Sequence, residues 1–144
     1  MANTVTSNEL NVVQGFGERQ LLRTTDATVT PGMLLVLGTD GNWDLAADDS
    51  TGVLCIAQNS SANLDAKGTN YDFVGVDAMV IGIPVNSGAE VEIPADALAA
   101  DYVAVLNAPV YAAADGLVDD DGSIVIGYVT DSNTTSGSVT VLLG

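Results

Sequence analysis

The chain has 144 residues and a mass of 14.6 kDa, which is enough for one compact domain. Nineteen Asp and Glu residues stand against three Lys and Arg residues, so the formal net charge is −16. This balance excludes the basic patches that bind nucleic acid or an anionic membrane surface. The absence of histidine removes the commonest general base and metal ligand, and the single cysteine excludes an intramolecular disulfide or a thiolate zinc cluster.

The first residues carry no basic group followed by an apolar run, so we expect no secretory signal. The longest apolar stretches are about 6 residues, far short of the roughly 20 that span a bilayer. These observations predict a soluble protein.

Residues 1–27 are rich in Asn, Thr, Gln and Gly, with no sustained period of 2 or 3.6. Such a segment buries little apolar surface to offset its chain entropy, so we expect an extended arm that becomes ordered against another surface. Both arginines of the chain, Arg19 and Arg23, lie in this segment, together with Glu9 and Glu18. Residues 1–25 are therefore neutral, and residues 26–144 carry the whole charge of −16.

From Thr28 onward, short apolar runs alternate with Asp-Gly and Ser-Gly turns, a pattern that predicts β-strands. The expected strands are residues 33–37, 53–57, 71–76, 78–83, 89–93, 123–129 and 137–142. The run 123–129 places Ile124, Ile126 and Tyr128 on one face of a regular strand. One stretch, 94–101, is typical of a helix of about two turns. The predicted fold is mostly β: a small barrel-like domain of short strands over residues 28–144 with at most one short helix, preceded by the arm.

Two segments of the chain echo each other. Residues 30–57 and 108–128 each run from a proline-led apolar strand through an Asp-Gly turn and an acidic loop to a second apolar strand. The turns are Asp40-Gly41 and Asp115-Gly116. Two copies predict similar hairpins in one small barrel or sandwich, not a solenoid.

Candidate chemical sites are few. Without histidine no Ser-His or Cys-His pair can form, and Cys55 lies inside an apolar run, as a buried small hydrophobe would. Composition leaves a glycosidase-type carboxylate pair open, but the clefts that hold such pairs are lined with aromatics, which total 5% here, and Trp43 stands at a predicted turn. Residues 119–121 and 48–49 are acidic turns of the kind that calcium prefers, yet they lack the EF-hand spacing, so we expect solvated hairpin turns. We predict no enzyme activity, cofactor or metal site.

Three segments of the first half carry a family resemblance: Thr30-Pro31-Gly32-Met33-Leu34-Leu35, Asp40-Gly41-Asn42-Trp43-Asp44-Leu45-Ala46 and Gly52-Val53-Leu54-Cys55-Ile56-Ala57. A Thr-Pro-x-x-Leu entry, a tryptophan-bearing loop and a Gly-(Val/Ile)-Leu-x-x-Ala strand resemble the head decoration protein of lambda-type tailed phages. The second half resembles the related capsid cement family in the segments Ala108-Pro109-Val110-Tyr111, Asp115-Gly116-Leu117-Val118, Ile126-Gly127-Tyr128-Val129 and 137–143. The resemblance covers about residues 28–144, and residues 67–100 have no clear counterpart in the lambda-type protein.

The resemblance implies a small β-tulip domain that is made in the host cytoplasm and assembles as a homotrimer on the outer surface of the capsid. It implies that the arm runs over the major capsid protein, adds a strand to it and clamps neighbouring subunits after the shell expands. The expected partners are thus the major capsid protein and further copies of this chain, with no nucleic acid and no membrane.

On this reading the capsid contact lies in the arm. Guanidinium groups would pair with capsid carboxylates, leucines would fill apolar grooves between subunits, and the backbone around Val12 and Val13 would add a strand to an exposed edge. The expected contact residues are Val12, Val13, Phe16, Arg19, Leu21, Leu22 and Arg23.

The alternative is an adhesive or receptor-binding surface module, such as a head fibre or a surface-layer protein. An adhesin would concentrate exposed aromatic side chains at its loop tips. The chain offers mainly Trp43, Tyr71 and Tyr102 for that role.

Overall fold

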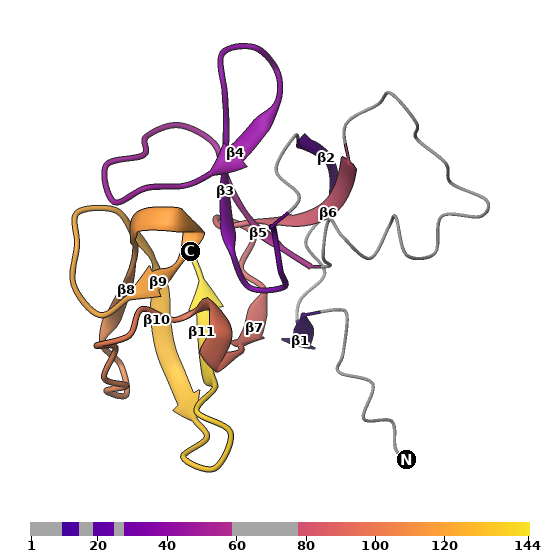
Figure 1. Ribbon diagram of the computed structural model, residues 1–144. Helices are drawn as coiled ribbons and strands as arrows, with labels where there is room; N and C mark the ends of the chain where they lie inside the picture. The colour runs from indigo at the N-terminus through magenta and orange to yellow at the C-terminus, as the bar shows by residue number, and fades with distance from the viewer. Residues whose placement is uncertain (1–9, 15–18, 25–27, 59–77) are drawn as a thin grey trace.

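The computed structural model describes residues 10–14, 19–24, 28–58 and 78–144, which form two antiparallel sheets (Figure 1). The predicted fold class is confirmed: the protein is mostly β and barrel-like. The six-stranded sheet has the order β1-β7-β11-β10-β8-β9, with β1 (Asn11–Gln14), β7 (Glu90–Ile93), β11 (Val139–Leu143), β10 (Val125–Ser132), β8 (Pro109–Ala112) and β9 (Val118–Asp119). The five-stranded sheet has the order β2-β6-β5-β3-β4, with β2 (Gln20–Thr24), β6 (Ala78–Pro84), β5 (Leu54–Ala57), β3 (Leu34–Leu37) and β4 (Trp43–Leu45). Its end strands β2 and β4 come into contact, so this sheet is nearly closed.

Strand β5 shows how the core is divided, because all four of its residues are buried. Leu54 and Ile56 point into the large apolar cluster between the two sheets. Cys55 and Ala57 point the other way, into a smaller cluster with Trp43 that the curled five-stranded sheet encloses. The five-stranded sheet is thus covered on both faces here, whereas the six-stranded sheet packs one face on the core.

The echo between residues 30–57 and 108–128 corresponds to a repeated strand arrangement. In the first segment β3 lies between β5 and β4, and in the second β8 lies between β10 and β9. Each unit forms one end of its sheet. The units also touch, since the Gly116 N–H donates to the carbonyl of Ala46 at 2.8 Å.

The predicted helix at 94–101 is shorter than expected. It is one 3-10 turn, η1 (Ala95–Ala97), and Leu98 is already extended. The reason is competition from strand pairing: Leu98 forms a parallel bridge with Val118, and the Ala99 N–H donates to the Val118 carbonyl at 2.8 Å. A second 3-10 turn, η2 (Ala114–Gly116), occupies one predicted Asp-Gly turn. Glycine is required there, because Gly116 has φ +74° and an added Cβ would lie 3.0 Å from the Leu34 carbonyl oxygen.

No helical turn in the described part of the chain is long and apolar enough to cross a membrane.

The predicted arm does not stand apart from the domain where the structure describes it. Strand β1 pairs with β7, and β2 pairs with β6 over five residues. Leu10 belongs to the large cluster and Leu22 to the small one. The predicted boundary at residue 27 is therefore wrong as a limit of the core, because β1 and β2 each add a strand to one of the two sheets. Both strands are too short to show a hydrophobic period in the sequence. The strand predicted at 71–76 lies outside the described residues.

Candidate interaction surface

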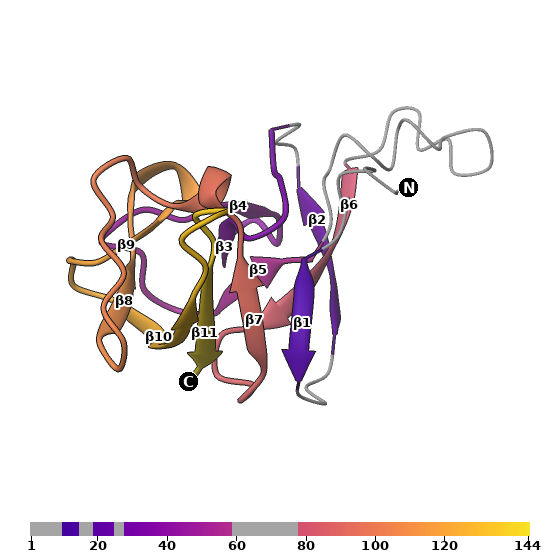
Figure 2. The ribbon, with the colours of Figure 1, turned by 90° about the horizontal axis from the view of Figure 1, so that it is seen from below.

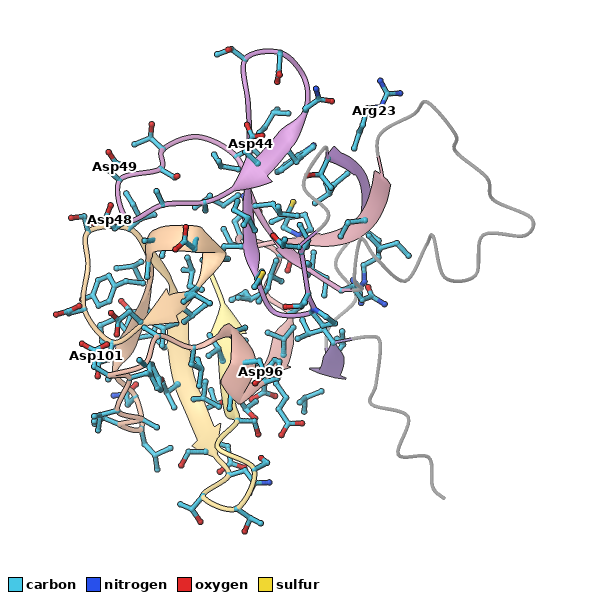
Figure 3. The ribbon with its side chains drawn as sticks, viewed as in Figure 1. Arg23, Asp44, Asp48, Asp49, Asp96 and Asp101 are labelled. Atoms are coloured by element: carbon cyan, nitrogen blue, oxygen red, sulfur yellow. The ribbon has the colours of Figure 1, made fainter. Side chains whose placement is uncertain are left out.

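The seven residues expected to contact a capsid divide by exposure. Val13 is half-exposed, and Arg19 and Arg23 are exposed. The Arg19 Nε donates to Gln58 Oε1 at 2.9 Å, which holds the start of β2 against the end of β5. In the view of Figure 3, Arg23 lies at the β2 side, whereas Asp48, Asp49 and Asp101 lie at the opposite side. Arg23 is thus separated from these three carboxylates.

The other four expected contacts do not form one group. Leu22 of β2 is fully buried in the small cluster, so its assignment to a capsid groove is wrong: it fills this protein's own core. Val12 is half-buried and packs on the large cluster. The backbone of Leu21 pairs with Ile81. Phe16 and the side chain of Leu21 lie outside the described residues.

Strand β1 presents a strand edge. Among the described residues, β7 is its one strand neighbour, and no other described strand pairs with the opposite edge of β1. The register shifts between Val12 and Gln14, which makes Val13 the extra residue of a bulge. Leu10 anchors the strand, because its N–H donates to the Gln58 carbonyl at 2.6 Å. An ordered edge of this kind can accept a strand from another chain.

The loop between η1 and β8 carries an apolar surface that sequence reasoning missed. Val103, Val105 and Leu106 are each more than half exposed. The loop is nonetheless fixed at both ends: the Val103 N–H donates to Asp120 Oδ2 at 2.7 Å, and the Asn107 N–H donates to the Val129 carbonyl at 2.8 Å. No period could reveal this segment, because it is neither helix nor strand.

A shallow groove of about 570 Å³ lies beside this loop. One wall is the apolar segment around Leu98 and Ala99, and the other is the β10–β11 turn with Asn133 and Ser138. The Tyr102 hydroxyl is buried here and is without a hydrogen-bond partner among the described residues. Burial raises the pKa of this hydroxyl, and the charges of Asp120 and Asp119 raise it further.

Asp119, Asp120 and Asp121 form the one group of carboxylates in the described residues that is close enough to hold a cation, with ligand atoms within 4.8 Å of one another. Asp119 Oδ1 accepts the Asp120 N–H at 2.7 Å, and Asp120 accepts the Val103 N–H. Partial burial raises the pKa of the Asp119 carboxyl, as do the charges of Asp101, Asp120 and Asp121, while the Asp120 N–H lowers it. These hydrogen bonds give Asp119 and Asp120 a structural role that needs no ion.

Two residues considered for chemistry are part of the core. Cys55 is fully buried, and burial raises the pKa of its thiol to about 11, so the thiolate nucleophile is suppressed. Trp43 opens β4 and is buried in the same cluster, although a turn position was predicted.

The chain matches no protein-family model, and no curated protein matches it. A function must therefore be inferred from its own residues.

Proposed function

We propose that this protein is a capsid decoration, or cement, protein of a tailed-phage head. It binds the outer surface of the expanded capsid as a homotrimer and clamps neighbouring major capsid protein subunits. The observation that carries this proposal is the edge of β1 that no described strand pairs with. The edge is contributed by the N-terminal segment, which is where the resemblance places strand addition to the major capsid protein.

The distribution of charge also supports the proposal. A chain with a formal net charge of −16 is repelled by acidic surfaces. Arg19 and Arg23 lie exposed at and beside β2, and guanidinium groups pair bidentately with carboxylates. These side chains give the N-terminal segment the means to hold an acidic part of a shell.

The adhesive alternative has less support. Trp43 is in the core, Tyr102 is half-buried, and Tyr71 lies outside the described residues. The aromatic side chains that were candidates for exposed loop tips thus do not gather on the described surface.

The test is binding of the purified protein to empty expanded capsids, with Val13→Pro and Val13→Ala as a matched pair. Proline removes the backbone N–H at a bulge on an edge strand, a position that tolerates proline. Losing one hydrogen bond of about 0.5–1.5 kcal/mol should weaken binding roughly 2- to 12-fold. Val13→Ala keeps the N–H and should bind nearly as the wild type does. Equal binding by both variants would contradict strand addition through the Val13 N–H.

A second pair tests the arginines. Replacing Arg19 and Arg23 together by alanine should weaken capsid binding most at low ionic strength, because salt screens exposed ion pairs. Replacing both by lysine keeps the charge and should restore part of the binding. A capsid affinity that is unchanged at every salt concentration would contradict this role.

A further inference from the structure

The outer face of the six-stranded sheet carries a continuous apolar strip, which the strand register defines. Leu142 of β11 is the cross-strand partner of Tyr128 of β10, and Tyr128 is the partner of Pro109 of β8. Val125 is the partner of Tyr111, two residues beyond Pro109. Cross-strand partners share a face, so these five residues lie together on the side away from the core. We call them the outer strip; Figure 2 shows β7, β11, β10 and β8 side by side.

The outer strip is exposed and has a neighbour of the same character. Leu142 is 43% exposed and Tyr128 45%. The loop that carries Val103, Val105 and Leu106 leads directly into Pro109, at one end of the strip. Six of the nine large hydrophobic side chains that are exposed in the described residues belong to the strip or to this loop. Concentration of this kind marks an interaction surface, whereas scattered exposed residues need no explanation.

Acidic side chains border the outer strip on both sides. Glu90 of β7 is the cross-strand partner of Leu142, and Asp119 of β9 is the partner of Tyr111. Glu90 Oε2 accepts the Thr130 hydroxyl at 2.6 Å, which fixes that carboxylate beside the strip. The two described arginines belong to the other sheet's side, with Arg23 in β2 and Arg19 just before it. The strip is therefore an apolar centre between two negative margins.

We propose that the outer strip docks on a protein surface with an apolar centre flanked by lysine or arginine, and that this surface belongs to the major capsid protein. An interface of this form removes the apolar centre from water and pairs charges at its rim. A second copy of this chain fits poorly, because a chain with 19 acidic and 3 basic residues has few cations to set against Glu90 and Asp119. The identity of the partner rests on the proposed function.

The first part of the experiment compares Leu142→Lys with Leu37→Lys in binding to empty expanded capsids. The two leucines match closely: each lies on a strand, and they are 43% and 42% exposed, but Leu37 is on the other sheet. Lysine at 142 faces Glu90, so it should not disturb folding. We expect Leu142→Lys to lower capsid affinity at least tenfold, and Leu37→Lys to stay within twofold of the wild type. Thermal unfolding of both variants establishes that they are folded.

The second part of the experiment tests the two negative margins of the outer strip with the double variant Glu90→Gln and Asp119→Asn. Both amides keep an acceptor oxygen for the hydrogen bonds that the carboxylates make. Wild-type binding should weaken as salt rises, and the double variant should bind more weakly at low salt with a flatter salt dependence. Identical salt dependence for the two proteins would overturn the assigned margins.

The outcomes separate this inference from the function on which it rests. If the wild type binds capsids and folded Leu142→Lys binds equally well, the outer strip is not the contact and the decoration function stands. If Leu142→Lys instead changes the sedimentation of the free protein and leaves capsid affinity intact, the strip joins copies of this chain, and the inference is wrong. If the wild type does not bind, the decoration function and the inference fall together.

Discussion

Truncation of Leu22 tests whether the N-terminal segment belongs to the folded domain. Leu22 is fully buried on β2, and Leu22→Ala removes three carbon atoms from the small cluster. At about 0.8 kcal/mol for each buried group the transfer loss is about 2.4 kcal/mol, and the cavity adds to it. Because β2 is an end strand that can partly collapse into the space, we expect a loss of about 3 kcal/mol in the free energy of unfolding. If the N-terminal segment lay outside the core, Leu22→Ala would cause almost no loss in the free energy of unfolding.

Gly82 makes the prediction sharper, because it faces Leu22 from β6. An added Cβ at Gly82 would lie 2.5 Å from Leu22 Cδ1 and 3.1 Å from the Cys55 Cβ. Gly82→Ala alone should therefore cost about 1–3 kcal/mol through overpacking. With Leu22→Ala the closest clash disappears, and the new methyl group occupies part of the cavity. The double variant should be more stable than the sum of the single changes by about 1–2 kcal/mol.

Urea unfolding followed by Trp43 fluorescence measures these energies, since Trp43 is the only tryptophan and packs in the same cluster. Arg23→Ala is the control: it changes the next residue of β2, whose side chain is exposed, and should alter stability by less than about 0.5 kcal/mol. A Leu22→Ala loss as small as that of Arg23→Ala would show that β2 is not part of the core. If the stability losses of Leu22→Ala and Gly82→Ala simply add in the double variant, Leu22 does not pack on Gly82.

Three other predictions concern burial, charge and assembly. Cys55→Ala should cost about 1–2 kcal/mol as a small core truncation, and the Cys55 thiol, with its pKa raised to about 11, should react with a disulfide reagent only after denaturation. The raised pKa of Asp119 means that the folded state holds this proton more tightly than the unfolded state does, so the associated stability is present at acid pH and is lost as pH rises through the folded pKa. Asp119→Asn should therefore be more stable than the wild type at neutral pH and lose that advantage near pH 4. Urea titrations at both pH values would show this. Equal stability of the two proteins at neutral pH would contradict the raised pKa of Asp119. Light scattering of the protein alone or on capsids should give a trimer, and a monomer in both states would contradict the proposed assembly.

Sequence reasoning succeeded where burial leaves a local pattern. The alternation in β7 and β11 and the apolar run of β5 identified strands, and the position of Cys55 within that run identified it as buried. The echo of residues 30–57 in 108–128 corresponds to the shared arrangement of three strands. In each case the residues that carry the pattern are neighbours in sequence.

The features that sequence reasoning missed depend on partners distant in sequence. The five residues of β2 form a strand because β6, more than fifty positions later, supplies their hydrogen bonds. The helix predicted from 94–101 ends early because the backbone at Leu98 and Ala99 pairs with Val118 instead. Composition favoured an arm and a helix in these places, and tertiary pairing overrode both preferences.

The outer strip itself depends on a bulge that no alternation rule could reveal. A regular strand over 123–129 would place Ile126 and Tyr128 on one face, as the sequence predicted, but the register shifts between Val125 and Gly127. Ile126 is therefore buried while Tyr128 turns outward beside Leu142. Gly127 permits this geometry, because a Cβ there would collide with the Leu142 carbonyl oxygen. The same bulge thus completes the core with one side chain and builds the proposed docking surface with another, which ties the interaction surface to the fold.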